Sequence, residues 1–567
     1  MFVSNISLTD NGKSYYGGYV NDDWKVTPKL TVNLGVRYDF FGLVYEHHAN
    51  QANFVPGGPP TGGPMYIIPT GPNAGNLSPS FLSLLAKDGI TLATTGAYGT
   101  GLGHSQKGNF APRIGLAYQF TPKLVVRTGF GIFYNGFENR GFSPNLGENY
   151  PFQFNFSFAS PNDTTPITFP GCGTAGPGGS ATFETGFSCT PLSPLLVNAS
   201  GLGLRGIQFN YQTPYSMGGN LTVQYQLTPS MSLQAGYVTS LARHLESFPG
   251  SNSPTSIAAS NTPEATLVPF PDFGFNSSYA ATGGMSAYHS LQTKVEKQFA
   301  DGLNFLFTYT WSKTMSDAGD LLNGGSVAGY RAPNVPGLGM AFDYGLADFD
   351  IRNVFHFSGG YELPFGKGKH FMSDASGIQD KLVGGWSLNW STTLQGGQPI
   401  SLGCPSGTAS NLGCGGLFTG QPLDLGLHTD KNGLLSYFGN PAAFVQPCVL
   451  GAGGVPEAGT PAGCTPLTGA QALGGITQVP GPGFHRVDFS VFKVIPIRER
   501  IQVQFRAEIF NILNHPNFNA PGFGGNGVQS ISGSTNYVNN STFGEIGSTR
   551  DAPYDPRQIQ FALKLVF

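Results

Sequence analysis

Thirteen segments of this chain alternate apolar and polar residues, a pattern that places the two kinds on opposite faces of a β-strand. The last segment, Arg557–Phe567, runs to the C-terminus, and the residues between its apolar positions are mostly polar. Its apolar positions are Ile559, Phe561, Leu563, Leu565 and Phe567. A transmembrane β-barrel turns such an apolar face to lipid and the polar face to its lumen. The pattern therefore predicts an all-β fold, an antiparallel transmembrane β-barrel with about 13 strands in this chain.

The expected strands form six hairpins and one final strand. The segments are Ser14–Val26, Leu30–Phe40, Asn109–Phe120, Leu124–Asn135, Pro214–Leu227, Met231–Ser240, Ser286–Phe299, Leu303–Thr314, Asp350–Leu363, Trp386–Ile400, Phe484–Ile497, Ile501–Leu513 and Arg557–Phe567. Three hairpins turn at Thr-Pro, where proline presets the backbone for a tight turn and ends the strand. The hairpins are separated by irregular stretches of about 35 to 80 residues, and this asymmetry is typical of outer-membrane barrels. We therefore expect periplasmic turns, long extracellular loops and integral insertion in the outer membrane of a Gram-negative type of cell.

Composition agrees with a barrel and excludes several other classes. Only 11% of the 567 residues are charged, against about 25% in typical globular proteins. The mean hydropathy of -0.08 is too polar for a helical membrane protein, and there is no run of about 18 apolar residues. A net charge of -3 without a Lys/Arg cluster predicts no nucleic-acid partner. A soluble sandwich, propeller or β-helix is the alternative fold, but no repeat period supports a propeller or solenoid, and a sandwich needs no lipid-like face on every strand.

Several motifs near the C-terminus resemble one recurring ending. They are Tyr437–Phe444 (YFGNPAAF), Pro480–Lys493 (PGPGFHRVDFSVFK), Gln504–Phe518 (QFRAEIFNILNHPNF), Phe543–Thr549 (FGEIGST) and Arg557–Phe567 (RQIQFALKLVF). This ending resembles the C-terminal barrel of Oar-like TonB-dependent receptors of the acidobacterial type, and Tyr16–Phe40 resembles an earlier hairpin of the same barrels. The resemblance implies a barrel of about 22 strands, an N-terminal plug, a TonB box and transport energised by the TonB complex.

The chain departs from that family pattern at its N-terminus. We find no plug or TonB box before Ser14, and Met1–Asp10 lacks the features of a signal peptide. Residues 1–567 are therefore expected to be the C-terminal portion of the barrel, an N-terminally truncated product that TonB could reach only through a missing plug. The expected function is uptake of an unidentified substrate by an outer-membrane receptor, without catalysis and without a cofactor. The alternative is a structural or adhesive surface protein that binds partners through its large loops.

Six cysteines form three close pairs in Gly/Pro-rich stretches between strands. The pairs are Cys172 with Cys189, Cys404 with Cys414, and Cys448 with Cys464. Sequence alone does not determine the connectivity of six cysteines. Closeness within loops favours local disulfides in an oxidising compartment, and free thiols are the alternative.

Four charged residues occupy the expected lumen faces: Arg37, Arg127, Arg506 and Glu508. They could hold a plug or line a substrate path, but interstrand salt bridges are the favoured interpretation. The terminal Phe567 is expected to act as an assembly signal for the barrel assembly machinery, as the resemblance to outer-membrane proteins ending in phenylalanine implies. Outer-membrane lipid is the other expected partner.

Other polar clusters favour structural roles over metal binding. His47 and His48 follow Glu46, but adjacent residues in an extended chain point to opposite faces. The aspartates before the strand at 350 are Asp343, Asp348 and Asp350, and they lack EF-hand spacing, which favours solvated turns over a calcium loop. His515 precedes a proline at a strand end and is expected in a turn rather than a catalytic site.

Overall fold

The computed structural model describes the chain except for residues 1, 5–8, 137–144, 158–166, 169–179, 182–192, 259–261, 276, 319–332, 404–411, 413–414, 430–432, 449, 451, 457–462, 476, 499–500, 522–527, 530–542 and 551–555. None of the helices in the described residues is both long enough and apolar enough to cross a bilayer.

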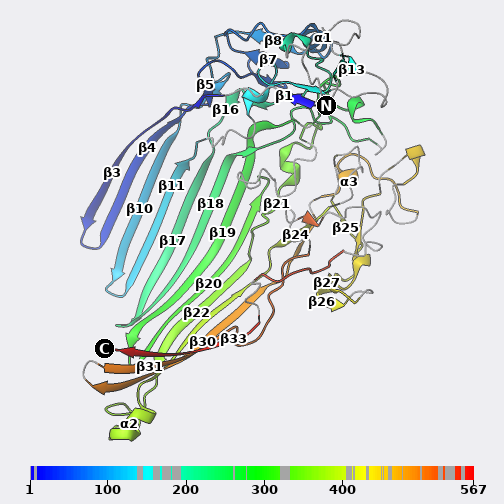
Figure 1. Cartoon of the computed structure of the whole chain (residues 1–567). Helices are drawn as coiled ribbons and strands as arrows, with labels where there is room; N and C mark the ends of the chain where they lie inside the picture. Colours follow the sequence, from blue (N-terminus) through cyan, green and yellow to red (C-terminus); the bar gives the residue numbers. More distant parts are fainter. Residues whose placement is uncertain are drawn as a thin grey trace.

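One large antiparallel sheet dominates the molecule, and thirteen of its strands pair in sequence order (Figure 1). In pairing order they are β3 (Tyr15–Thr27), β4 (Leu30–Phe41), β10 (Phe110–Thr121), β11 (Leu124–Tyr134), β17 (Tyr215–Thr228), β18 (Met231–Ser247), β19 (Tyr279–Ala300), β20 (Leu303–Ser316), β22 (Asn353–Glu362), β23 (Trp386–Gln395), β30 (Phe484–Arg498), β31 (Ile501–Phe510) and β33 (Gln558–Val566). Each corresponds to one of the thirteen segments expected from the alternation. The predicted all-β, antiparallel fold is confirmed.

The register between strands keeps each kind of side chain on one face. Val503 pairs with Leu565, and Phe505 pairs with Leu563, so apolar residues of β31 and β33 share a face. Gln504 pairs with Lys564 on the opposite face. We call the apolar side the lipid face and the polar side the lumen face. Period-2 alternation in every strand maintains this division across the sheet.

Short turns join the strands at one end of the sheet, which we call the turn end. In two Thr-Pro-Lys turns the threonine hydroxyl accepts hydrogen bonds from backbone N–H groups: Thr27 from Leu30 at 3.0 Å, and Thr121 from Leu124 at 3.0 Å. The turn between β19 and β20 has positive φ at both central residues, 53° at Asp301 and 77° at Gly302. Asp-Gly suits such a turn because both residues tolerate this conformation, and its twist matches that of the flanking strands.

Some strand limits differ from those expected. β19 begins seven residues before the predicted start at Ser286, because its first residues pair with loop segments at the other end of the sheet. The expected strand Trp386–Ile400 is split, and Pro399–Leu402 forms a separate strand, β24. β24 pairs with β29 (Thr477–Pro480) in a small sheet outside the large one.

The long loops gather at the other end of the sheet, the loop end, and contain most of the buried core (Figure 1). The first three loops share one apolar cluster, the first cap, in which Phe54, Tyr66 and Phe81 are fully buried. The fifth loop, between β23 and β30, and the sixth loop, between β31 and β33, share another apolar cluster. We call this cluster the second cap, and it includes Phe438 and Phe444. Our expectation of irregular loops was therefore wrong for these segments, because their apolar residues are numerous enough to form cores of their own.

The helix of the first cap illustrates local signals within the loops. α1 (Pro79–Lys87) begins after Ser78, whose side chain accepts a hydrogen bond from the Phe81 N–H at 3.1 Å, and Pro79 occupies the first helical position. Phe81 and Leu85 lie one turn apart and are buried. The first cap also contains a three-stranded sheet of β6 (Asn53–Val55), β7 (Met65–Ile68) and β8 (Thr91–Thr94).

The remaining elements are short. The strands are β1 (Phe2–Ser4), β2 (Asn11–Gly12), β5 (Tyr45–Glu46), β9 (His104–Ser105), β12 (Asn155–Ser157), β13 (Ile167–Thr168), β14 (Ser180–Ala181), β15 (Gly206–Ile207), β16 (Asn210–Tyr211), β21 (Gly345–Leu346), β25 (Leu417–Phe418), β26 (Leu425–Thr429), β27 (Leu435–Phe438), β28 (Phe444–Val445) and β32 (Val528–Gln529). The helices are α2 (Gly377–Val383), α3 (Ala470–Leu473) and the 3-10 helices η1 (Leu146–Glu148), η2 (Pro194–Leu196), η3 (Glu264–Thr266), η4 (Met340–Asp343), η5 (Pro441–Ala443) and η6 (Ala452–Gly454).

Candidate functional site: the lumen face and the caps

A continuous row of polar residues crosses the lumen face of seven neighbouring strands. Successive members are directly paired in the sheet register, from β17 to β30. The row consists of Gln224, Gln234, Lys294, Thr308, His356, Thr393 and Arg486. Adjacent members can bond across strands, as His356 Nδ1 and Thr393 Oγ1 do at 3.0 Å. Such a surface requires water or a polar partner rather than lipid.

The four predicted lumen charges lie on the lumen face, but their partners differ from the expected interstrand salt bridges. Arg37 forms its ion pair with Asp39 of the same strand at 2.8 Å, and Arg37 Nη2 also donates to the Tyr15 hydroxyl at 2.5 Å. Arg127 Nη1 donates to the neutral amide of Gln224 at 2.6 Å. These contacts are compatible with the alternation of the strands, since residues two apart on one strand share a face.

The other two charges also have neutral neighbours. The Arg506 guanidinium lies 5.0 Å from the centre of the Phe492 ring and donates to Gln504 at 3.4 Å. Glu508 accepts a hydrogen bond from Gln560 on β33. Among the described residues, Arg127, Arg506 and Glu508 have no oppositely charged group within ion-pair distance. None of these three groups therefore forms an ion pair with another described residue of the wall.

A polar pocket of about 290 Å³ lies at the turn end of β11, β17, β18 and β19. Arg127 and Gln224 line it together with Gln226 and Glu296. Glu296 forms an ion pair with Lys294 at 2.6 Å. The pocket thus combines the Arg127 guanidinium and the Glu296 carboxylate with several amide groups, a set suited to hydrogen bonds with a polar chain or a polar ligand.

Two buried asparagines that sequence inspection did not single out join the loops of the first cap. The Asn149 side chain donates to the carbonyls of Ala52 at 2.6 Å and Arg205 at 2.8 Å, and it accepts from the Arg205 N–H at 2.8 Å. The Asn53 side chain likewise donates to the carbonyls of Leu102 and Ile207 and accepts a hydrogen bond from the Ile207 N–H. The signal available in the sequence was weak, because both asparagines stand in loops already rich in asparagine.

Tyrosine hydroxyls add further links inside the same cap. The Tyr66 hydroxyl donates to the Tyr150 carbonyl, and the Tyr150 hydroxyl donates to the Pro194 carbonyl at 2.8 Å while accepting from the Ser78 N–H at 2.7 Å. Burial raises the pKa of Tyr66 well above its ordinary value, because charge is disfavoured away from water. The cap is therefore one folded unit built from three loops.

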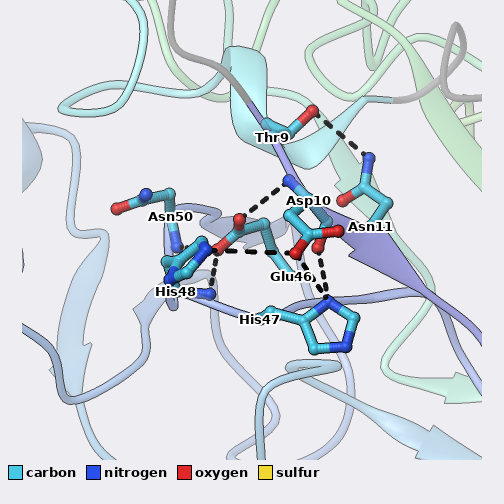
Figure 2. Close-up of polar contacts among 7 residues, drawn as sticks. All are labelled: Thr9, Asp10, Asn11, Glu46, His47, His48 and Asn50. Atoms are coloured by element: carbon cyan, nitrogen blue, oxygen red, sulfur yellow. Dashed lines mark hydrogen bonds and ion pairs between the residues drawn. The ribbon is translucent and has the colours of Figure 1, made fainter.

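The His47–His48 pair belongs to a junction between the N-terminal segment and the first loop (Figure 2). The buried Glu46 carboxylate accepts from the backbone N–H groups of Asp10 at 3.0 Å, His48 at 2.8 Å and Asn50 at 2.7 Å. The His47 Nδ1 lies 2.9 Å from the Asp10 carbonyl oxygen. Because the Glu46 oxygens are occupied by backbone donors, the junction has a structural role.

The other clusters considered for metals are also tied into the backbone. Asp350 is buried, and its Oδ1 accepts from the Thr314 N–H at 2.6 Å. Asp343 is buried in η4, so the expectation of solvated turns is wrong for Asp343 and Asp350. The His515 N–H donates to the Asn511 side chain at 3.1 Å, just after β31 ends. Across the described ranges, no group of three or more His, Cys, Asp or Glu residues is arranged to hold a metal ion.

Of the predicted cysteine pairs, the structure describes one. Cys448 and Cys464 form a disulfide with their Cα atoms 6.1 Å apart, and Cys448 is buried. Cys172, Cys189, Cys404 and Cys414 lie outside the described residues. The full disulfide pattern therefore stays a prediction.

A family model described as an outer membrane beta barrel domain matches residues 3–560. The chain belongs to the outer membrane beta-barrel domain family. The match spans almost the whole chain, so the large sheet is the wall of an outer-membrane barrel, and the protein is located in the outer membrane. The loop end with its caps faces the cell exterior, and the turn end faces the periplasm.

Comparison with solved structures gives matches to outer-membrane transporters. The chain is similar to the FrpB iron transporter from Neisseria meningitidis, with 10% identity, a TM-score of 0.38, and coverage of 98% of this chain and 45% of that one. It is similar to the outer membrane transporter YddB from Escherichia coli, with 9% identity, a TM-score of 0.40, and coverage of 97% and 45%. It is also similar to the siderophore receptor PirA from Acinetobacter baumannii, with 9% identity, a TM-score of 0.38, and coverage of 98% of this chain and 46% of that one.

This member of the outer membrane beta-barrel domain family thus spans less than half the length of those solved chains. No curated protein sequence matches it.

Proposed function

We propose that this chain is the C-terminal barrel portion of an Oar-like TonB-dependent receptor that takes up an unidentified substrate. The observation that carries the proposal is the lumen face, where a polar row spans seven strands and where, among the described residues, Arg127 and Arg506 have no carboxylate within ion-pair distance. A wall of this kind is stabilised by a polar body inside the barrel, which in a TonB-dependent receptor is the plug. The motifs that resemble the Oar-like ending give independent support.

The ends of the strand path agree with a larger barrel. β3 and β33 are its first and last members, and within the described residues no pairing joins them. Open edges are very costly in hydrocarbon because their N–H and C=O groups lack partners. We infer that further strands complete the wall, that residues 1–567 supply the last 13 of about 22, and that TonB acts through a plug outside this chain.

The motifs of the recurring ending also have a place in this proposal. Tyr437–Phe444 contributes Phe438 and Phe444 to the second cap, where both rings contact Phe543 of the Phe543–Thr549 motif at centroid distances of 4.9 and 5.4 Å. Those motifs therefore form part of the core of the second cap at the loop end, the end where, in this proposal, the receptor first meets its substrate. The proposal includes no catalytic step and no cofactor.

The alternative function is a structural or adhesive surface protein. The folded caps favour it, because a rigid outer surface can bind a partner without transport. Adhesion through the loops does not require charged groups on the lumen wall, whereas a receptor needs a polar wall to hold its plug. The lumen face therefore favours the receptor.

An uptake experiment distinguishes the two functions. Cells with and without TonB would produce this chain, or the chain extended by its upstream coding region, and would be given a panel of labelled iron–siderophores, cobalamin, oligosaccharides and peptides. The receptor proposal expects TonB-dependent accumulation of one compound by the extended chain only. Arg127→Gln with Arg506→Gln should reduce that accumulation, whereas Lys29→Gln at an exposed turn should not. Partner binding that persists without TonB, with no accumulation, would instead support the adhesive function.

A further inference from the structure

The connection between β22 and β23 forms a small projection at the turn end of the sheet (Figure 1). It contains α2, in which Ile378 and Leu382 lie one helical turn apart and are 77% and 68% exposed. The rings of Phe365 and Phe371 stack beside it with centroids 5.4 Å apart, and both are exposed as well. We call residues 364–385 the foot. Its apolar side chains form an exposed patch that water alone would not stabilise.

Two side chains of the lipid face hold the foot. Trp386 and Lys493 are paired in the register of β23 and β30, on the same face as Phe505 and Leu563. Trp386 Nε1 donates to the Leu382 carbonyl at 3.0 Å, and Lys493 Nζ donates to the same carbonyl at 3.2 Å and to that of Gly384. The end of α2 is therefore bound to the lipid side of the wall and not to the lumen side.

The exposure of the foot matches that of residues that contact lipid. Leu291 and Trp311, which pair on the lipid face of β19 and β20 inside the sheet, are 43% and 54% exposed, so Ile378 and Leu382 are at least as exposed as side chains that face lipid. Because the foot adjoins the lipid face at its periplasmic edge, its apolar patch continues the hydrocarbon-facing surface into the zone of the headgroups. Aromatic and aliphatic side chains at that level are typical of interfacial anchors.

The foot also carries exposed lysines around its apolar patch. Lys369 is paired with Glu362 at 3.0 Å. In the described part of the chain, Lys367 and Lys381 have no carboxylate within ion-pair distance, and both are exposed. Lysines can extend their charged ends to headgroups while their stems lie along apolar surface. A phosphate group supplies the negative charge that these two ammonium groups lack.

We propose that the foot is a phospholipid-binding anchor that seats α2 in the periplasmic leaflet of the outer membrane. Ile378 and Leu382 enter the acyl boundary, and Lys367 and Lys381 contact headgroup phosphates with a preference for anionic lipid. This inference depends on the outer-membrane location and not on TonB-dependent transport. The foot would fix the height of β22 and β23 in the bilayer.

Photo-crosslinking in the full chain tests the apolar contact. Benzoylphenylalanine would replace Ile378, with Leu563 on the lipid face as the positive control and Leu195 in η2 of the first cap as the negative control. The experiment uses outer-membrane fractions in which the Leu563 variant forms phospholipid adducts. We expect phospholipid adducts at Ile378 with a yield within about threefold of Leu563, because both side chains lie in lipid. Protein adducts at Ile378, or a yield no higher than at Leu195, would overturn the proposal.

A second measurement tests the headgroup contact. The same Ile378 variant would be reconstituted in vesicles of phosphatidylethanolamine and phosphatidylglycerol at a ratio of about three to one, which approximates an anionic bilayer surface. Lys367→Gln with Lys381→Gln should lower the share of phosphatidylglycerol in the adducts by about fivefold or more, since each lysine near an anionic surface contributes measurably to binding. Lys29→Gln, at another exposed turn, should leave the share unchanged. An unchanged share in the double variant would refute headgroup recognition.

Discussion

Asn53 exchanges two hydrogen bonds with the backbone of Ile207, although 154 residues separate them in the sequence. The Nδ2 donates to the Ile207 carbonyl at 3.0 Å, and the Ile207 N–H donates to Oδ1 at 2.8 Å. The Asn53 Nδ2 also donates a hydrogen bond to the Leu102 carbonyl, at an N–O distance of 3.0 Å. One buried amide thus joins the first and second loops within the first cap.

Replacing that amide should loosen the first cap. Asn53→Ala leaves buried backbone groups of Ile207 and Leu102 without partners, at about 1–3 kcal/mol for each group. Hydrogen exchange of the Ile207 amide should accelerate by about a hundredfold. Asn73→Ala is a matched control, because its side chain donates to Asn50 at 2.9 Å on the exposed surface. Equal exchange in the two variants would show that Asn53 does not hold the loops together.

The lipid and lumen faces should respond differently to one added charge. Phe561→Arg places a guanidinium in lipid and should lower the free energy of unfolding by about 2–4 kcal/mol near the bilayer midplane. Gln560→Arg places the same group opposite Glu508 on the lumen face and should be nearly neutral. Unfolding in denaturant from lipid vesicles would measure both, with Phe561→Leu correcting for the lost ring. Similar penalties for the two arginine variants would mean that the faces are assigned wrongly.

The strands of the wall could be predicted because one physical rule governs every position in them. In β31, lipid on one side and polar surroundings on the other require Val503 and Phe505 to alternate with Gln504 and Arg506. Turn residues such as Thr27 added local hydrogen bonds that end each strand. The predicted strand end at Ile400 was wrong, because Gly396, Gly397 and Gln398 interrupt the strand, and the residues that follow pair with β29 instead of β30.

The caps and the partners of the lumen charges could not be predicted in the same way. Phe54 is buried against Phe270 at a centroid distance of 5.2 Å, a contact between loops that no local pattern encodes. The Ser78-Pro79 start of α1 was a readable signal, but it lies in a segment expected to be irregular. Arg37 was expected to pair across strands and instead pairs along its own strand with Asp39, since that carboxylate lies on the same face.

The cysteine pairs are expected to be disulfides within single loops. For Cys448 and Cys464, separated by 16 residues, closing the loop should contribute about 3 kcal/mol in a chain-entropy estimate. Cys448→Ser should therefore lower the thermal stability of the loop between β23 and β30. Peptide mass spectrometry without reduction should find this bridge together with the Cys172–Cys189 and Cys404–Cys414 bridges. Bridges between different pairs, or free thiols, would contradict the local pattern.

The C-terminal phenylalanine should act as an assembly signal and not only as a lipid-facing side chain. Phe567 directly follows β33, the last strand of the path, and is 92% exposed, so its ring is free to be recognised before the wall is complete. We predict that deleting Phe567 lowers outer-membrane insertion by about tenfold while synthesis is unchanged, because β33 would then end without the aromatic ring that we expect the assembly machinery to recognise. Phe567→Tyr retains an aromatic terminus and should insert nearly normally, and Phe349→Ala removes a 59% exposed ring at the loop end as a control. Fractionation of membranes from cells producing each variant measures the inserted share. If the deletion variant inserts as well as the unmodified chain, Phe567 is only a lipid-facing side chain and not an assembly signal.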